Sequence, residues 1–128
     1  TEERADVALD LLQACLSGAV RLQVPPLFRA EVGNVVRQRM RREEVSLNDA
    51  EWLLDRLLGL PVETIEPVGL LKRALVLATR FNLPAIYDAH YLALAEIAGC
   101  DLWTDDRRLL RQVGAGFPAV RWIGDYGP

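Results

Sequence analysis

Apolar residues along the chain recur with two different periods, one typical of helices and one typical of strands. Val7, Leu11 and Cys15 recur at helical spacing in the first segment, whereas apolar and polar residues alternate over 19–24. Along the whole chain, the pattern predicts helices over 2–17, 26–42, 47–59, 67–81, 85–98 and 106–112, and strands over 19–24, 62–65, 100–103 and 119–123. Strands that alternate with helices predict an α/β fold, in which a parallel sheet flanked by helices makes three layers.

Residues that begin or end helices support these boundaries. Ser46 is a good N-cap, and Asp49 follows it in the capping-box position with a shorter acid. Pro84 cannot continue the helix before it, and Gly99 is suited to close the helix over 85–98. The element ends are therefore predicted from local chemistry as well as from periodicity.

The predicted sheet lacks one expected feature. A parallel sheet covered on both faces usually contains a strongly apolar central strand, and none of the predicted strands is a long run of Val and Ile. The chain also begins on a helical pattern at Thr1, which is not a start methionine. We expect either that a first strand precedes this sequence or that another chain covers the gap.

Size and composition indicate one domain over 1–128 with a real core. Half of the residues are apolar and the net charge is −3, which excludes a disordered chain. No apolar run approaches the roughly 20 residues of a membrane helix, and no signal peptide is visible. Cys15 and Cys100 fit a reducing cytoplasm, and we expect both to be small buried hydrophobes. The single histidine, His90, has no partner at zinc spacing and is expected to pack on its own helix.

Arginine greatly outnumbers lysine. The chain has fourteen arginines and one lysine. The arginines gather on the helix over 26–42 (Arg29, Arg37, Arg39, Arg41, Arg42) and beside an Asp pair (Arg107, Arg108, Arg111). Arginine binds phosphate through two hydrogen bonds, so this distribution fits an anionic polymer held by its backbone. A solvated helix face is the plainer alternative for each run taken alone.

Acidic residues fall where predicted strands end and helices begin. Glu31 lies in the first turns of one helix, Asp88 lies near the start of another, and Asp105 and Asp106 follow the strand over 100–103. Ligands of open parallel sheets bind at this edge. Each acid also has a structural explanation, because acids are favoured near helix N-termini and Thr104 or Asp105 is a good N-cap.

Taken together, these acids predict a divalent-metal site. Glu31 and Asp88 stand beside apolar residues, so we expect them to be partly buried. Carboxylates about 4 Å apart repel by several kcal/mol at an effective dielectric of about 20, unless one is protonated or a cation lies between them. A site of carboxylates alone selects Mg²⁺ or Mn²⁺, and such ions activate water for attack on phosphates.

Three stretches of the chain resemble the PIN domain, and in particular the VapC-type toxin ribonucleases. They are Pro26-Leu27-Phe28-Arg29-Ala30-Glu31-Val32-Gly33-Asn34, Leu83-Pro84-Ala85-Ile86-Tyr87-Asp88-Ala89-His90-Tyr91-Leu92-Ala93-Leu94-Ala95, and Leu102-Trp103-Thr104-Asp105-Asp106-Arg107-Arg108-Leu109. The resemblance covers nearly the whole chain in order and spacing. It implies a cytoplasmic, Mg²⁺- or Mn²⁺-dependent endoribonuclease that is the toxin of a toxin–antitoxin pair.

The resemblance also implies roles for individual residues. Four acids of the family surround the metal: Glu31 matches the second, Asp88 the third and Asp106 the acid of the Thr-x-Asp motif. Thr104 supplies the threonine of that motif, and Asp105, in its variable place, is a second candidate ligand. No residue of this sequence matches the first acid. The implied partners are RNA, held by Arg29, Arg107 and Arg108, a cognate antitoxin, and a second copy of the chain as a homodimer.

Other functions remain in competition with the nuclease. The unmatched first acid favours a non-catalytic PIN-like protein that binds RNA or a partner. A phospho-acceptor receiver domain needs a lysine near its last strand, and the only lysine is Lys72. The chain has no Gly-rich phosphate loop, and its strands do not fit a helix-turn-helix DNA binder.

Overall fold

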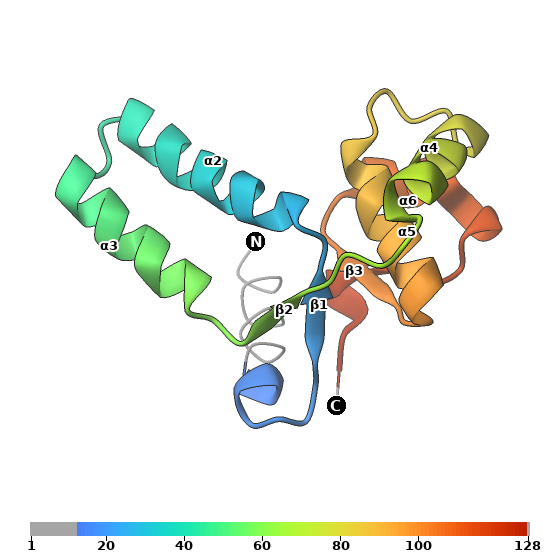
Figure 1. Ribbon diagram of the computed structural model, residues 1–128, viewed down its shortest axis with the longest axis horizontal. Helices are drawn as coiled ribbons and strands as arrows, with labels where there is room; N and C mark the ends of the chain where they lie inside the picture. The colour runs from blue at the N-terminus through green and yellow to red at the C-terminus, as the bar shows by residue number, and fades with distance from the viewer. Residues whose placement is uncertain (1–12, 128) are drawn as a thin grey trace.

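Helices and strands alternate along the chain, as the sequence predicts. The computed structural model describes residues 13–127. In chain order the elements are β1 (Leu22–Val24), α2 (Leu27–Arg41), α3 (Leu47–Leu58), β2 (Val62–Thr64), α4 (Leu70–Arg80), α5 (Tyr87–Ala98), β3 (Leu102–Thr104), α6 (Arg107–Val113) and β4 (Val120–Trp122), with 3-10 turns η1 (Gly114–Gly116) and η2 (Ile123–Asp125) (Figure 1). The predicted helix over 2–17 lies mostly outside the described residues, although residues 13–16 are helical. The other predicted helices and strands are confirmed, with ends shifted by a few residues.

The strands are parallel, as predicted, but they do not form one continuous sheet in the described part of the chain. β1 pairs with β2, with Leu22 opposite Val62, and β3 pairs with β4, with Leu102 opposite Val120. Each strand is three residues long. The separation agrees with the lack of a strongly apolar central strand among the predicted strands.

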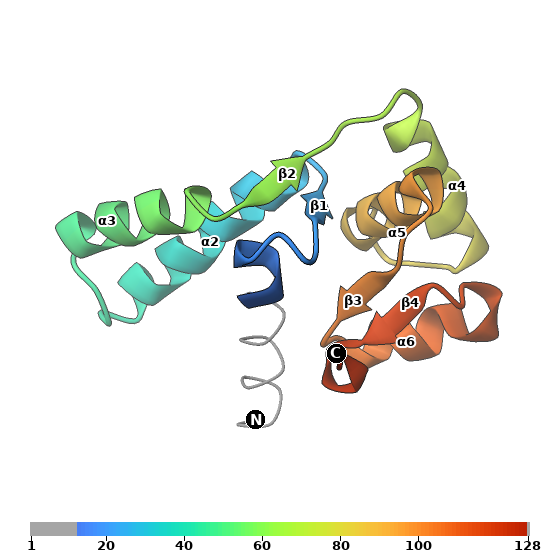
Figure 2. The same ribbon diagram turned by 90° about the horizontal axis from the view of Figure 1, so that it is seen from below.

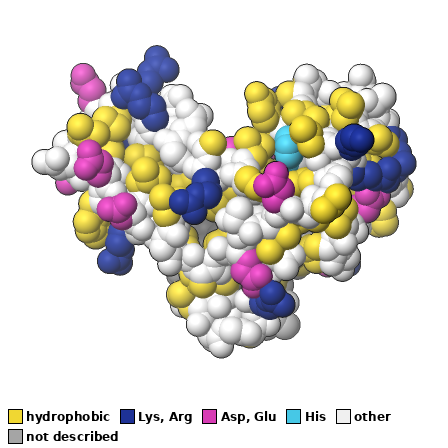
Figure 3. Space-filling view, in the orientation of Figure 1, with side chains coloured by type: hydrophobic (Ala, Val, Ile, Leu, Met, Phe, Trp, Pro, Cys, Tyr) yellow, Lys and Arg dark blue, Asp and Glu magenta, His cyan; other side chains and the backbone are white. Residues whose placement is uncertain are grey.

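Two groups of elements lie on either side of the β1–β2 sheet (Figures 1 and 2). Helices α2 and α3 run side by side, and we call residues 27–58 the α2–α3 arm. Helices α4, α5 and α6 gather with β3 and β4, and we call residues 70–122 the α4–α6 lobe. Between the arm and the lobe the surface is hollowed, and acidic side chains lie in this region (Figure 3).

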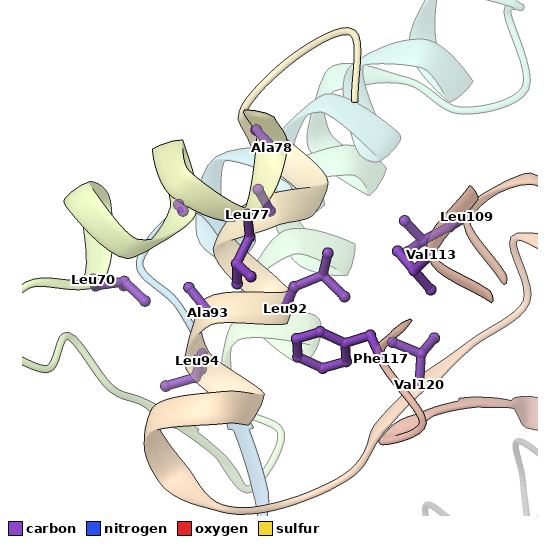
Figure 4. Close-up of a cluster of buried hydrophobic side chains, with 12 residues drawn as sticks. Leu70, Leu77, Ala78, Leu92, Ala93, Leu94, Leu109, Val113, Phe117 and Val120 are labelled. Carbon is purple, nitrogen blue, oxygen red and sulfur yellow. The ribbon is translucent and has the colours of Figure 1, made fainter. Parts of the chain in front are cut away.

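The main buried core lies within the α4–α6 lobe. Leu77 of α4 and Leu92 of α5 have no exposed surface, and they lie in one cluster with Phe117 and Val120 (Figure 4). A large apolar side chain contributes about 1.5–3 kcal/mol when it is fully buried, so this cluster is a major source of stability. Among the residues of α2 and α3, by contrast, only Val36 and Ala50 are buried. The lobe therefore holds α5 firmly, while the arm is less well anchored.

Capping residues and glycine set several helix ends, as predicted. The Oγ of Ser46 accepts a hydrogen bond from the Asp49 N–H at 3.2 Å and caps α3. Gly99 adopts a positive φ of 68° and ends α5. Cys15 is buried, but the prediction for Cys100 was wrong, because this residue follows the turn at Gly99 and is exposed. No helix within residues 13–127 is long and apolar enough to cross a membrane.

Candidate active site

Asp88 is the acid on which the charges of the other candidate ligands act. It lies in the first turn of α5, a helix fixed by the core of the lobe. Partial loss of solvent around its carboxyl group raises the pKa of that group, and the charges of Asp106 and Glu31 raise it further, while Arg108 lowers it. Acids on α2, on α5 and after β3 are thus close enough to interact, although they are far apart in sequence. The prediction that these three acids approach one another agrees with this coupling.

Asp106 and Thr104 build the turn between β3 and α6. Asp106 is the N-cap of α6, and its Oδ1 accepts hydrogen bonds from the N–H groups of Arg108 (2.9 Å) and Leu109 (3.3 Å). The prediction of Thr104 or Asp105 as the cap was therefore wrong. Thr104 Oγ1 instead accepts a hydrogen bond from the Asp106 N–H at 3.0 Å, which orients the turn. Asp105 lies between them and is exposed.

Glu31 makes a contact that the sequence interpretation missed. The hydroxyl group of Tyr91 donates a hydrogen bond to Glu31 Oε1, joining α5 to α2. Burial, together with the carboxylates of Glu31 and Asp88, raises the pKa of Tyr91. Tyr91 follows Asp88 by three residues, and residues at this spacing share one side of a helix. That spacing was the available signal that Tyr91 belongs to the site.

The arginines near the acids divide between two different contacts. Arg108 Nε lies 3.9 Å from Asp106 Oδ1, whereas the Arg107 guanidinium stacks 4.1 Å from the centre of the Trp122 ring. Trp122 was also missed from the sequence. Its β4 position is the register partner of Thr104 on β3, which explains why it lies near the acids. Arg29 instead lines a small cavity with residues of α3 and β2, including Leu57 and Thr64.

The chemistry of the acids suits a hard divalent ion, but their positions do not form a ready-made metal site. Within residues 13–127, no three acidic, histidine or cysteine side chains are close enough together to hold an ion. Glu31 and Asp88 are both exposed residues, so the prediction that they are partly buried was wrong. Carboxylates that interact in this way repel one another, and a cation between them would offset the repulsion. The all-oxygen chemistry and the mutual effect on the pKa of Asp88 support Mg²⁺ or Mn²⁺ as the ion that would fit.

Other features lie apart from this chemistry. His90 packs on its own helix as predicted, with Nδ1 2.8 Å from the carbonyl oxygen of Ile86. A cavity of about 370 Å³ is lined by residues that include Arg80, Cys100 and Phe117. It lies at the C-terminal end of α5 and ahead of β3, opposite the ends that carry Asp88 and Asp106. The larger of the two cavities described is therefore not at the acids.

The alternating parallel architecture and the three coupled acids are accompanied by a clear family match. The chain belongs to the PIN domain family, which it matches over residues 1–115. Among its relatives, VapC ribonuclease Mb0985 from Mycobacterium bovis (strain ATCC BAA-935 / AF2122/97) is 38% identical over 94 residues, which cover 73% of this chain and 72% of that protein. Ribonuclease VapC9 from Mycobacterium tuberculosis (strain ATCC 25618 / H37Rv) matches to the same extent.

Replacement of Asp88 by asparagine is expected to raise the melting temperature in buffer that contains EDTA. A raised folded-state pKa means that the ionised carboxylate destabilises the folded protein at neutral pH. The gain should persist near pH 7 and disappear as the pH falls below the ordinary pKa of 3.8, where the carboxyl group is neutral in both states. Thermal unfolding of both proteins between pH 3 and 8 measures the difference. A lower melting temperature for the variant at pH 7 would show that helix capping by Asp88 outweighs repulsion.

Proposed function

We propose that this chain is a divalent-metal-dependent endoribonuclease. The observation that carries the proposal is the electrostatic effect of Glu31 and Asp106, acids from two other segments, on the carboxyl group of Asp88. The names of the relatives, which are ribonucleases, support RNA as the substrate. The reaction would be hydrolysis of a phosphodiester bond within the RNA chain.

The acids have distinct parts in this proposal. Glu31, Asp88 and Asp106 would hold Mg²⁺ or Mn²⁺, with Asp105 as a further candidate ligand and Thr104 as support for the turn. The bound ion would polarise the phosphate and lower the pKa of water. Both capping hydrogen bonds of Asp106 use Oδ1, so Oδ2 is the oxygen expected to face the ion.

Asp88 is the best candidate to accept a proton during the reaction. The carboxylates of Glu31 and Asp106 both interact with it, so an oxygen of Asp88 that does not hold the ion would lie beside water bound there. The core of the lobe fixes α5, so this base is presented from a rigid helix. Water that attacks the phosphorus would then lose its proton to an oxygen of Asp88.

Arg107 and Arg108 would hold the RNA backbone beside the acids. The guanidinium of Arg107 packs on the Trp122 ring, and the residue is exposed, so its N–H groups would be available to phosphate. Arg108 offsets negative charge at Asp106 and Asp88 as well. Arg29, which was also predicted to bind RNA, lines the cavity next to α3 and would contact only RNA that extends along the arm.

A cleavage assay with and without divalent metal tests the proposed activity. The chain is expected to cut single-stranded RNA internally with Mn²⁺ or Mg²⁺ and to stop when EDTA is added, because the carboxylates alone cannot activate water. End-labelled RNA on a denaturing gel measures the products. RNA binding without cleavage in either metal would instead favour a non-catalytic PIN-like protein.

Arg107→Gln is expected to weaken RNA binding several-fold and to reduce the slope of log K against log salt by about 1, as for one lost phosphate contact. Fluorescence anisotropy in EDTA measures binding without cleavage. Arg56→Gln is the matched control, because Arg56 stacks on Trp52 in the α2–α3 arm, 5.1 Å from the ring centre. Equal losses for both variants would show that the arginines act through overall charge only.

We propose further that the chain acts with protein partners, as the toxin of a pair with an antitoxin and as a homodimer. Exposed apolar side chains support such contacts: Leu47 and Trp52 on α3, and Leu71 and Leu75 on α4, are each at least 60% exposed. Large apolar side chains in contact with water favour association with another protein.

A further inference from the structure

We infer that Tyr91 is a positioning residue that holds Glu31 at the proposed ion-binding site. The inference deepens the proposed function and depends on it. Tyr91 belongs to α5 of the lobe, and Glu31 belongs to α2 of the arm. Their hydrogen bond therefore fixes an acid from the less anchored part of the molecule against a helix from the well-packed part.

The two ends of this hydrogen bond differ in their freedom of movement. Tyr91 is half-buried, and its neighbours Leu92 and Ala93 are completely buried in the core. Glu31 is exposed on a helix that buries only Val36 among its residues. A free glutamate side chain samples many rotamers, and ordering it opposes ligand binding. Tyr91 removes part of this freedom before a cation arrives.

The geometry also opposes electrostatic repulsion. Glu31 interacts with the carboxylate of Asp88, and a like charge drives the exposed glutamate away from the site. The hydrogen bond to Oε1 holds it in place and leaves Oε2 for a cation.

Titration of the full chain with MnCl₂ tests this role without depending on catalysis. Isothermal titration calorimetry is expected to show Mn²⁺ affinity about 10-fold weaker for Tyr91→Phe than for the unsubstituted chain, a loss typical of residues that orient metal ligands. Tyr87→Phe is the control, since it removes a hydroxyl from an exposed tyrosine of the same helix. Circular dichroism and thermal unfolding verify that both variants fold.

Cleavage kinetics distinguish positioning from direct catalysis. If Tyr91 only positions Glu31, the Tyr91→Phe variant needs more Mn²⁺ for half-maximal activity but approaches the normal maximal rate at saturating Mn²⁺. A large loss at saturation would overturn a purely positioning role.

A double variant tests whether Tyr91 acts through Glu31. Tyr91→Phe should have little further effect on Mn²⁺ affinity when Glu31→Gln is already present, because the residue to be positioned has lost its charge. Additive losses would contradict the inference. Unchanged affinity of Tyr91→Phe alone would also overturn it and leave the nuclease proposal standing, whereas failure of the unsubstituted chain to bind Mn²⁺ would overturn both.

Discussion

Asp88→Asn is expected to lower the rate of metal-dependent RNA cleavage by about 10²- to 10⁴-fold, the range for loss of a general base. The substitution preserves the shape of the side chain but removes the charge with which the carboxylates of Glu31 and Asp106 interact. Since α5 is fixed by Leu92 and the other buried residues of the lobe, the fold should remain intact. Single-turnover cleavage at saturating Mn²⁺ measures the rate, and circular dichroism verifies the fold.

The control for Asp88 is Asp101→Asn, which removes one carboxylate from the opposite end of β3. Asp101 Oδ2 lies 2.9 Å from Arg121 Nε, so it belongs to a different ion pair. This variant should cleave at nearly the normal rate, because an exposed ion pair contributes at most about 1 kcal/mol to stability. Cleavage by Asp88→Asn at the normal rate would rule out the proposed role of Asp88.

A pair of substitutions at Asp106 is expected to separate its structural role from its chemical role. Asp106→Asn retains an oxygen that can cap α6 but loses the charge, so activity should fall about 10- to 100-fold or more while stability is nearly unchanged. Asp106→Ala should lose activity as well, and also about 1 kcal/mol of stability through the lost cap. Cleavage assays and urea unfolding measure the two effects.

The comparison between the two Asp106 variants is informative in itself. Equal destabilisation by asparagine and alanine would mean that the charge, and not the capping geometry, stabilises α6. Normal activity of Asp106→Asn would exclude Asp106 as a ligand of the ion and would make the neighbouring Asp105 the better candidate.

Much of the secondary structure could be predicted because its signals are local. Ser46 before α3 and Gly99 after α5 act on the backbone within a few residues, so the sequence itself contains the cause. Asp88 and Asp106 could be chosen as candidate site residues for the same reason, since each lies at the start of a helix. The choice of Asp106 over its neighbours as the cap of α6 depended on the path of the turn, which the sequence does not specify.

Long-range contacts were much harder to predict. The separation of the strands into two pairs depends on which edges meet in space. The Tyr91–Glu31 hydrogen bond and the Arg107–Trp122 stack each join segments that approach only in the folded chain. Periodicity indicated which side of α5 Tyr91 occupies, but it gave no information about the residue on α2 that would meet it.

The three acids proposed to hold the ion come from two groups of elements. Glu31 is attached to a helical hairpin, whereas Asp88 and Asp106 are attached to the packed lobe. Repulsion between these acids therefore acts between the hairpin and the lobe, at the place where the Tyr91–Glu31 hydrogen bond holds the two together.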